Sequence, residues 1–196
     1  MTRLVRTSLL AVFVLLGCHT VLAQEAKSLP VARLVSSGPI IPAAKRLTIT
    51  PASLTANASP TLAEAGAIEK RAFEQTNLIR VQNGLPALKW DADLCRMARA
   101  HSENMSDLNY FAHTTPDGQR LRDRARVAGI LTFKVLAENI AYNQGYEDPG
   151  AFAVERWMAS AKHRANILST EFSAMAIGTY VAPDGSVFLT QTFITR

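Results

Sequence analysis

The sequence predicts an α+β domain that follows an export segment and a linker. Two observations indicate this fold class. Proline-poor stretches with helical periodicity fill the middle of the chain, and two strand-like segments flank a tight turn at its end. Helices combined with a terminal antiparallel hairpin are typical of the α+β class. The sequence contains no P-loop, no glycine-rich dinucleotide motif and no internal repeat.

The first 23 residues have the parts of an export signal. Two arginines precede the apolar run SLLAVFVLLG, and VLA supplies small residues before a cut after Ala23. The run is too short to span a membrane as a stable helix. The alternative is a lipoprotein signal over residues 1–17, because LLGC is similar to a bacterial lipobox in which Cys18 is lipidated. The first alternative predicts a secreted or periplasmic protein, and the second a membrane-anchored one.

The composition changes twice after this signal. Residues 24–61 are rich in Pro, Ala, Ser and Thr without a sustained period, so we expect a flexible tether there. Residues 62–196 then form one domain. Only Cys95 remains after the export segment, inside a helical pattern, which favours a buried structural thiol. The formal net charge of +5 is too small to indicate a nucleic-acid partner.

Two long helices are expected at the start of the domain. AEAGAIEKRAFEQTNLIRVQNG predicts a helix that ends at Asn83-Gly84. LPALKW turns the chain, and Asp91 then caps the helix ADLCRMARAHSENM. His101 belongs to the apolar stripe of that helix and is expected to be a satisfied histidine beside the core. The other members of the stripe are Leu94, Met97, Ala98 and Met105.

The remaining elements follow in order. TTPDGQR predicts a tight turn, and the short helix RLRDRARVAG is expected to stop at Gly129. VLAENIAY is a strand or an extended segment, and DPGAFAVERWMASAKHRANIL is one helix or two joined near Ala161. SAMAIGTYVA and SVFLTQTFI flank Pro-Asp-Gly as a hairpin. One face of its first strand should carry Met175, Ile177, Thr179 and Val181.

Two residues draw attention for their chemistry. His113 comes just before the tight turn, where a side chain can face a cleft. Glu138 lies in a largely apolar stretch, where a buried carboxylate is costly unless it is paired or hydrogen-bonded. Neither residue alone indicates a site, since a lone loop histidine or buried acid more often has a structural role.

Five segments between residues 70 and 194 carry a family resemblance. They are NLIRVQNGLPALKWDADL, YFAHTTPDG, AENIAY, ERWMASAKHRANIL and GTYVAPDGSVFLTQTF. In this order they resemble the CAP superfamily in its bacterial branch (cysteine-rich secretory proteins, antigen 5 and pathogenesis-related 1, also called the SCP domain). The resemblance implies a monomeric three-layer α-β-α sandwich with a small antiparallel sheet.

The resemblance also implies an open cleft lined by two histidines and two acids. On this sequence the histidines are His113 and His163, and one acid is Glu138. Ser160 stands where animal and plant members have the second acid, as in bacterial relatives. Ala137 replaces a glycine that is usual in the family, and the family's disulfides are missing. These departures weaken the transfer of function from eukaryotic members.

Such a cleft is expected to bind Zn²⁺ weakly through His113 and His163, with water completing the coordination. Glu138 would orient one ring or handle a proton. A metal-dependent hydrolase would use the same residues, although a catalytic zinc usually has three protein ligands. A serine hydrolase would pair Ser160 with His163, but no G-x-S-x-G motif supports this. Glu138 and Ser160 are therefore candidates, and no catalytic residue is assigned.

The expected function is an extracellular binding module for a lipid or sterol, a glycan or a protein, because the family includes members linked to such ligands. A binding role is favoured over an enzymatic one, and a purely structural surface domain is the third hypothesis. Contact with a membrane is expected only if Cys18 is lipidated.

Overall fold

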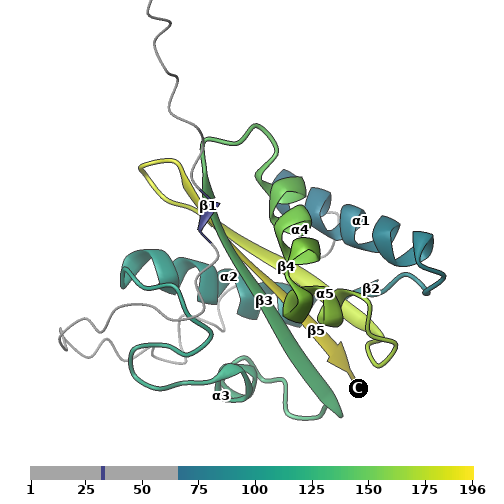
Figure 1. The fold of residues 1–196 in the computed structure, drawn as a ribbon. Coiled ribbons are helices and arrows are strands. Elements are labelled where there is room, and N and C mark those ends of the chain that lie inside the picture. Colours follow the sequence, from purple (N-terminus) through teal and green to yellow (C-terminus); the bar gives the residue numbers. More distant parts are fainter. Residues whose placement is uncertain (1–31, 34–65) are drawn as a thin grey trace, which may run out of the picture.

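The computed structural model describes residues 32–33 and 66–196. The predicted export signal, with Cys18 and Ala23, lies outside the described residues, as does nearly all of the predicted tether. The described part contains a five-stranded sheet covered by helices on both faces (Figure 1). No helix in this part has the length and apolar character needed to cross a bilayer.

The sheet has the strand order β1-β3-β5-β4-β2. Its antiparallel centre consists of β3 (Val135–Gln144), β5 (Ser186–Thr195) and β4 (Ala174–Val181). At one edge β1 (Ala32–Arg33) pairs antiparallel with the end of β3, and at the other β2 (Lys89–Trp90) pairs parallel with β4. The sheet is therefore antiparallel except at β2. Neither two-residue strand was predicted, because two residues are too few to show a strand period.

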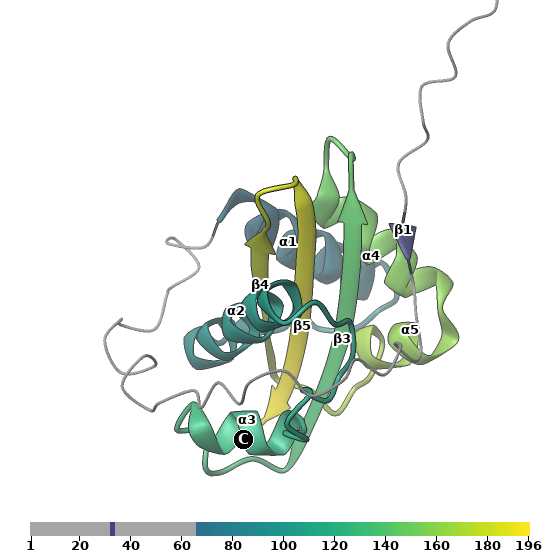
Figure 2. The same ribbon diagram turned by 90° about the vertical axis from the view of Figure 1, so that its left-hand side faces the viewer.

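The helices form the two outer layers of the expected α-β-α sandwich. One layer holds α1 (Ala67–Gln82), α4 (Pro149–Ala159) and α5 (Ala161–Ile167), and the other holds α2 (Ala92–Asp107) and α3 (Leu121–Val127). Figure 2 shows α2 in front of the sheet and α1 behind it. A separate apolar core lies on each side of the sheet, one built with α1 and α4 and the other with α2 and α3.

Local signals end and begin the first two helices where the sequence predicts. Gly84 follows α1 with φ 74°, a conformation that L side chains rarely adopt. The Asp91 side chain accepts a 3.0 Å hydrogen bond from the Leu94 N–H at the start of α2. The predicted stripe of α2 is buried, and so is the free thiol of Cys95. Burial raises the pKa of Cys95 to about 12, so it is an inert structural thiol.

The hairpin forms as predicted, and helices cover both faces of β4. Met175 and Ile177 are buried in the core beside α1 and α4, whereas Val181 is exposed near the turn. The opposite face of β4 lies against α2. A Cβ atom on Gly178 would lie 2.1 Å from the backbone nitrogen of Arg99. Glycine therefore lets α2 pack directly on the β4 backbone.

The segment that carries His163 forms two helices, α4 and α5, rather than one. Asp148 caps α4 by accepting a 2.9 Å hydrogen bond from the Ala151 N–H. Ser160 has extended backbone angles (φ −93°, ψ 122°), which end α4 and begin α5. Trp157 is fully buried, and its Nε1 donates a 3.0 Å hydrogen bond to the carbonyl of Ile140 on β3. The helix pair is thereby held against the strand that carries Glu138.

Candidate functional site

Strand β3 lies at the centre of the candidate site. Successive side chains of the strand point to opposite faces of the sheet, and therefore contact different helical layers. Glu138 points to the layer of α2 and α3, where it contacts His113. The next residue, Asn139, points to α5: it donates to the carbonyl of His163 at 3.2 Å and accepts from Asn166 at 2.8 Å. The two predicted histidines therefore come from opposite layers and approach β3 from its two faces.

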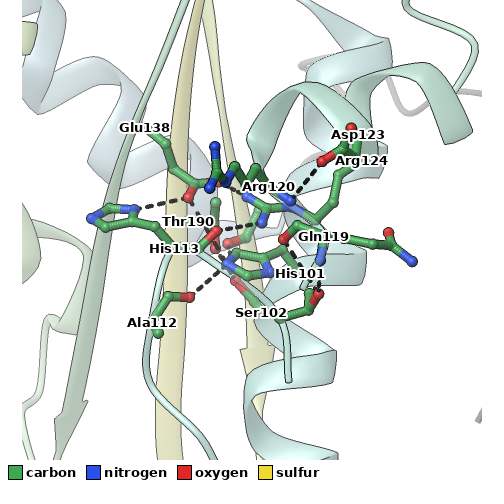
Figure 3. Close-up of polar contacts among 12 residues, drawn as sticks. His101, Ser102, Ala112, His113, Gln119, Arg120, Asp123, Arg124, Glu138 and Thr190 are labelled. Carbon is green, nitrogen blue, oxygen red and sulfur yellow. Dashed lines mark hydrogen bonds and ion pairs between the residues drawn. The ribbon is translucent and has the colours of Figure 1, made fainter. Parts of the chain in front are cut away.

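Glu138 is a buried carboxylate with a partner for each oxygen (Figure 3). Its side chain is 3% exposed. Oε1 accepts a 2.9 Å hydrogen bond from Nδ1 of His113, and Oε2 forms an ion pair with Nη2 of Arg124. Burial raises the pKa of this carboxyl, but the His113 hydrogen bond and the Arg124 charge outweigh burial and hold the pKa below its usual value. Glu138 is thus ionised and paired, as its apolar surroundings require.

His113 lies in the loop between α2 and α3, and its side chain is 52% exposed. The tight turn that follows is closed by a 2.9 Å hydrogen bond from Gly118 N–H to Thr115 C=O, and Gly118 has φ 90°. An ionised carboxylate can only accept hydrogen bonds, so Nδ1 of His113 carries the proton shared with Glu138. In the neutral ring, Nε2 then has a free lone pair.

His163 lies on α5 and is half-buried. Burial lowers the pKa of this imidazole, and the nearby charges of His113 and Lys162 lower it further. The ring is therefore neutral at pH 7. Its Nδ1 is buried and has no hydrogen-bond partner among residues 66–196.

Ser160 lies at the junction of α4 and α5 and is partly buried. Within the described part, no hydrogen bond joins its hydroxyl to His163 or Glu138. A shallow, open pocket of about 310 Å³ lies instead beside α3, where it is lined by His113, Thr114, Arg120, Leu121 and Glu138. The structure thus brings His113 and Glu138 into one pocket, whereas Ser160 and His163 do not belong to its lining.

Two nitrogen atoms near the site could hold a metal ion, one from His113 and one from His163. Groups of three or more His, Cys, Asp or Glu side chains suited to a metal were not found in the part of the chain that the structure describes. A metal site with two imidazole ligands therefore stays a prediction.

A third histidine, His101, is fully buried beside the site, as expected for the stripe of α2. Its Nε2 donates a 3.1 Å hydrogen bond to the carbonyl of Ala112, and its Nδ1 lies 3.4 Å from the hydroxyl of Tyr110. Nε2 also lies 3.9 Å from Oε1 of Glu138. Burial lowers the pKa of His101 to about 4, so this ring is neutral. His101 therefore belongs to the surroundings of Glu138 as well as to the core.

Arg124 is the residue at the site that sequence reasoning missed. It is 7% exposed on a short helix whose other arginines face solvent, so charge alone does not distinguish it. Its spacing does: Arg124 lies three residues after the partly buried Leu121 and four before the buried Ala128, on the inner face of the helix. A buried Glu138 needs a cationic partner, and an arginine on the inner face of this helix could have been predicted as that partner.

Comparisons with known proteins identify the family of this chain. The model of the family described as CAP, the cysteine-rich secretory protein family, matches residues 73–193. Among curated proteins, the uncharacterized membrane protein YlbC of Bacillus subtilis is 38% identical over 128 residues, which are 65% of this chain and 34% of that protein. The uncharacterized protein YkwD of the same organism is 38% identical over 158 residues, 79% of this chain and 59% of that protein. The match thus spans about a third of the length of YlbC and about three fifths of the length of YkwD.

Solved structures show the same fold. An extracellular protein containing a SCP domain from Bacillus anthracis is 33% identical with a TM-score of 0.56, and the match covers 66% of this chain and 40% of that one. An outer surface protein from Borrelia burgdorferi has a TM-score of 0.58 at 19% identity, covering 65% of this chain and 91% of that one. The second likeness concerns the fold alone.

Proposed function

The chain belongs to the bacterial branch of the cysteine-rich secretory protein (CAP) family, and on this basis we propose that it is an extracellular binding module whose recognition site is the pocket at His113 and Glu138. An extracellular place is supported by the predicted export signal and by the similarity to a B. anthracis protein described as extracellular. The secreted or periplasmic form and the form anchored through Cys18 both fit this proposal.

The observation that supports a binding role is that both oxygens of the Glu138 carboxylate already have partners. One oxygen accepts from His113, the other is paired with Arg124, and the side chain is almost completely buried. A general acid or base must come within hydrogen-bond reach of the proton that it transfers. Both Glu138 oxygens are already engaged by His113 and Arg124, and the role proposed for this carboxylate is to orient the His113 ring.

Nε2 of His113 is then the atom that meets a ligand. It can accept a hydrogen bond from a hydroxyl or an amide N–H, which sterols, glycans and proteins all carry. Leu121 gives the pocket an apolar wall, and Thr114 and Arg120 add polar groups beside it. This mixture of apolar and polar lining is usual for small-molecule sites.

Weak Zn²⁺ binding by the same histidines is part of the proposal. The fit rests on two features: Nε2 of His113 is not engaged with Glu138, and Nδ1 of His163 is a buried atom without a partner among residues 66–196. The lowered pKa of His163 keeps its lone pair available at pH 7. The ion would supply Lewis acidity when bound.

A hydrolase is the second candidate, and the His113–Glu138 pair is the observation that favours it. An exposed imidazole whose far nitrogen is held by a carboxylate is the arrangement of a general base. The two functions differ in their response to Glu138→Gln. An enzyme loses turnover while it stays folded, whereas a binding module loses affinity and has no turnover to lose.

The test is ligand capture from the native host. The mature protein is purified from that host, and co-purifying molecules are identified by native mass spectrometry. His113→Ala is treated in parallel, with Glu155→Gln as a surface control. We expect a defined ligand on the parent and on Glu155→Gln that is absent from His113→Ala. A ligand kept equally by all three proteins would place recognition elsewhere, and turnover of a captured molecule would favour the hydrolase.

A further inference from the structure

We propose that Arg124 is a positioning residue that sets the orientation of His113 by holding both partners of the His113–Glu138 pair at once. The inference rests on the proposed function, in which His113 presents Nε2 to a ligand. It adds a third residue to the site, contributed by α3.

The two contacts of Arg124 reach two different parts of the chain (Figure 3). Nη1 donates a 2.7 Å hydrogen bond to the backbone carbonyl of His113, and Nη2 pairs with Oε2 of Glu138. A guanidinium is planar and its N–H groups diverge at fixed angles. One rigid group therefore fixes the distance between the loop backbone at His113 and the carboxylate that receives the His113 ring.

The loop needs such an attachment because its functional side chain is half in solvent. A second buried side chain holds the preceding carbonyl: Nε2 of His101 donates to Ala112 C=O at 3.1 Å. Consecutive carbonyls at 112 and 113 are thus held from α2 and from α3. With the backbone fixed at these points, the hydrogen bond to Glu138 leaves the His113 ring one orientation.

Helix α3 is itself a firm base for Arg124. Ala125 and Ala128 are buried in the core beside α2, and Nη2 of Arg96 donates a 3.1 Å hydrogen bond to Ala128 C=O. A movement of Arg124 would have to displace this packing. The packing of α3 thereby fixes the position of the guanidinium at the site.

Stability alone is a poor explanation for a charged pair in this place. Buried ion pairs are often no more stabilising than apolar residues of similar volume. In the described part, Nε of Arg124 is buried without a hydrogen-bond partner, so the guanidinium is incompletely satisfied. The two N–H groups that are satisfied are the ones that join His113 to Glu138. This division of contacts favours a positioning role.

The test reads the His113 ring directly. Nitrogen-15 NMR of histidine-labelled full-length protein at pH 7 distinguishes protonated from unprotonated ring nitrogens. We expect the neutral ring of the parent to show a single tautomer, with Nδ1 protonated and Nε2 bare. In Arg124→Met this single tautomer is lost, because no side chain then holds the Glu138 carboxylate and the backbone at His113 at a fixed distance from each other. Arg124→Lys restores it in part, since one ammonium group cannot span both acceptors as the fork does.

Arg80→Met is the matched control. Arg80 is another fully buried arginine, and it donates to the carbonyls of Pro86, Ile167 and Ser169 away from the pocket. Its loss should lower stability and leave the His113 signals unchanged. Zn²⁺ titration gives a second readout: Arg124→Met should bind about ten-fold more weakly than the parent.

Unchanged His113 signals in Arg124→Met would overturn the inference, and so would an equal change in Arg80→Met. Full recovery of the parent signals in Arg124→Lys would also overturn it, because a single positive charge would then suffice without the planar guanidinium. If Arg124→Met fails to fold, the Lys variant decides. The NMR readout needs no ligand, so a failure of the proposed function is seen separately: the ring form would depend on Arg124 while neither Zn²⁺ nor any captured molecule binds the parent.

Discussion

His113 and Glu138 lie 25 residues apart in the chain, and the half-exposed ring of the first is tied to the buried carboxylate of the second by a 2.9 Å hydrogen bond. One end of this pair faces the pocket, and the other lies in the core beside Arg124. The pair therefore connects the stability of the domain to the orientation of its exposed imidazole. The predictions below separate these two effects.

Replacing Glu138 by Gln should destabilise the fold by about 3 kcal/mol, because it leaves the buried Arg124 guanidinium without its anion. Urea denaturation at pH 7 measures the free energy of unfolding. Glu155→Gln is the matched control, since Glu155 is exposed on α4, and it should change stability by less than about 0.5 kcal/mol. Equal stability of the two variants would mean that the buried pair contributes nothing to the fold.

Acid should weaken the fold through His101. Its folded pKa of about 4 lies below the ordinary histidine pKa of 6.5, so the unfolded chain binds more protons between these values. The contribution of the neutral buried ring is present above about 6.5 and is lost as pH falls toward 4. It amounts to about 3 kcal/mol across that window. Denaturation at several pH values should give a flatter profile for His101→Gln than for the parent. Parallel profiles would show that the ring does not titrate as a buried group.

The export signal can be tested through Cys18, which lies outside the described residues. We expect Cys18→Ser to be exported and cut after Ala23, because VLA is a cleavage signal of its own. Mass spectrometry of the mature N-terminus, with fractionation of the host cells, checks this. A parent that starts at a lipidated Cys18 and leaves the membrane in the variant would establish the lipoprotein alternative instead.

Local patterns in the sequence predicted most elements of the fold. The Asp91 cap, the stop at Gly84 and the terminal hairpin depend on residues a few positions apart, and each is found as expected. Burial of Cys95 followed from its place in a helical period. The three-layer arrangement could not come from such patterns. It came from the resemblance to the CAP family, which the family match confirms.

The site was predicted less completely than the fold. The apolar neighbours of Glu138 showed that it needs a partner, but they did not identify Arg124. The helical spacing of Arg124 places it on the inner face of α3, and only the folded structure shows that this face meets Glu138. The approach of His113 and His163 from opposite faces of β3 likewise depends on the alternation at Glu138 and Asn139 in the folded strand. Ser160 stays a prediction as a member of the cleft.

Zn²⁺ titration by calorimetry tests most directly the claim that His113 and His163 form a binding site. We predict weak binding by the parent, a loss of at least about ten-fold in affinity for His113→Ala and for His163→Ala, and no change for Glu155→Gln. Binding should also weaken in acid, because a protonated imidazole has no lone pair for the ion. The lowered pKa of His163 keeps its ring competent to a lower pH than an unperturbed histidine. Equal Zn²⁺ affinity of the parent and both single histidine variants would contradict the account.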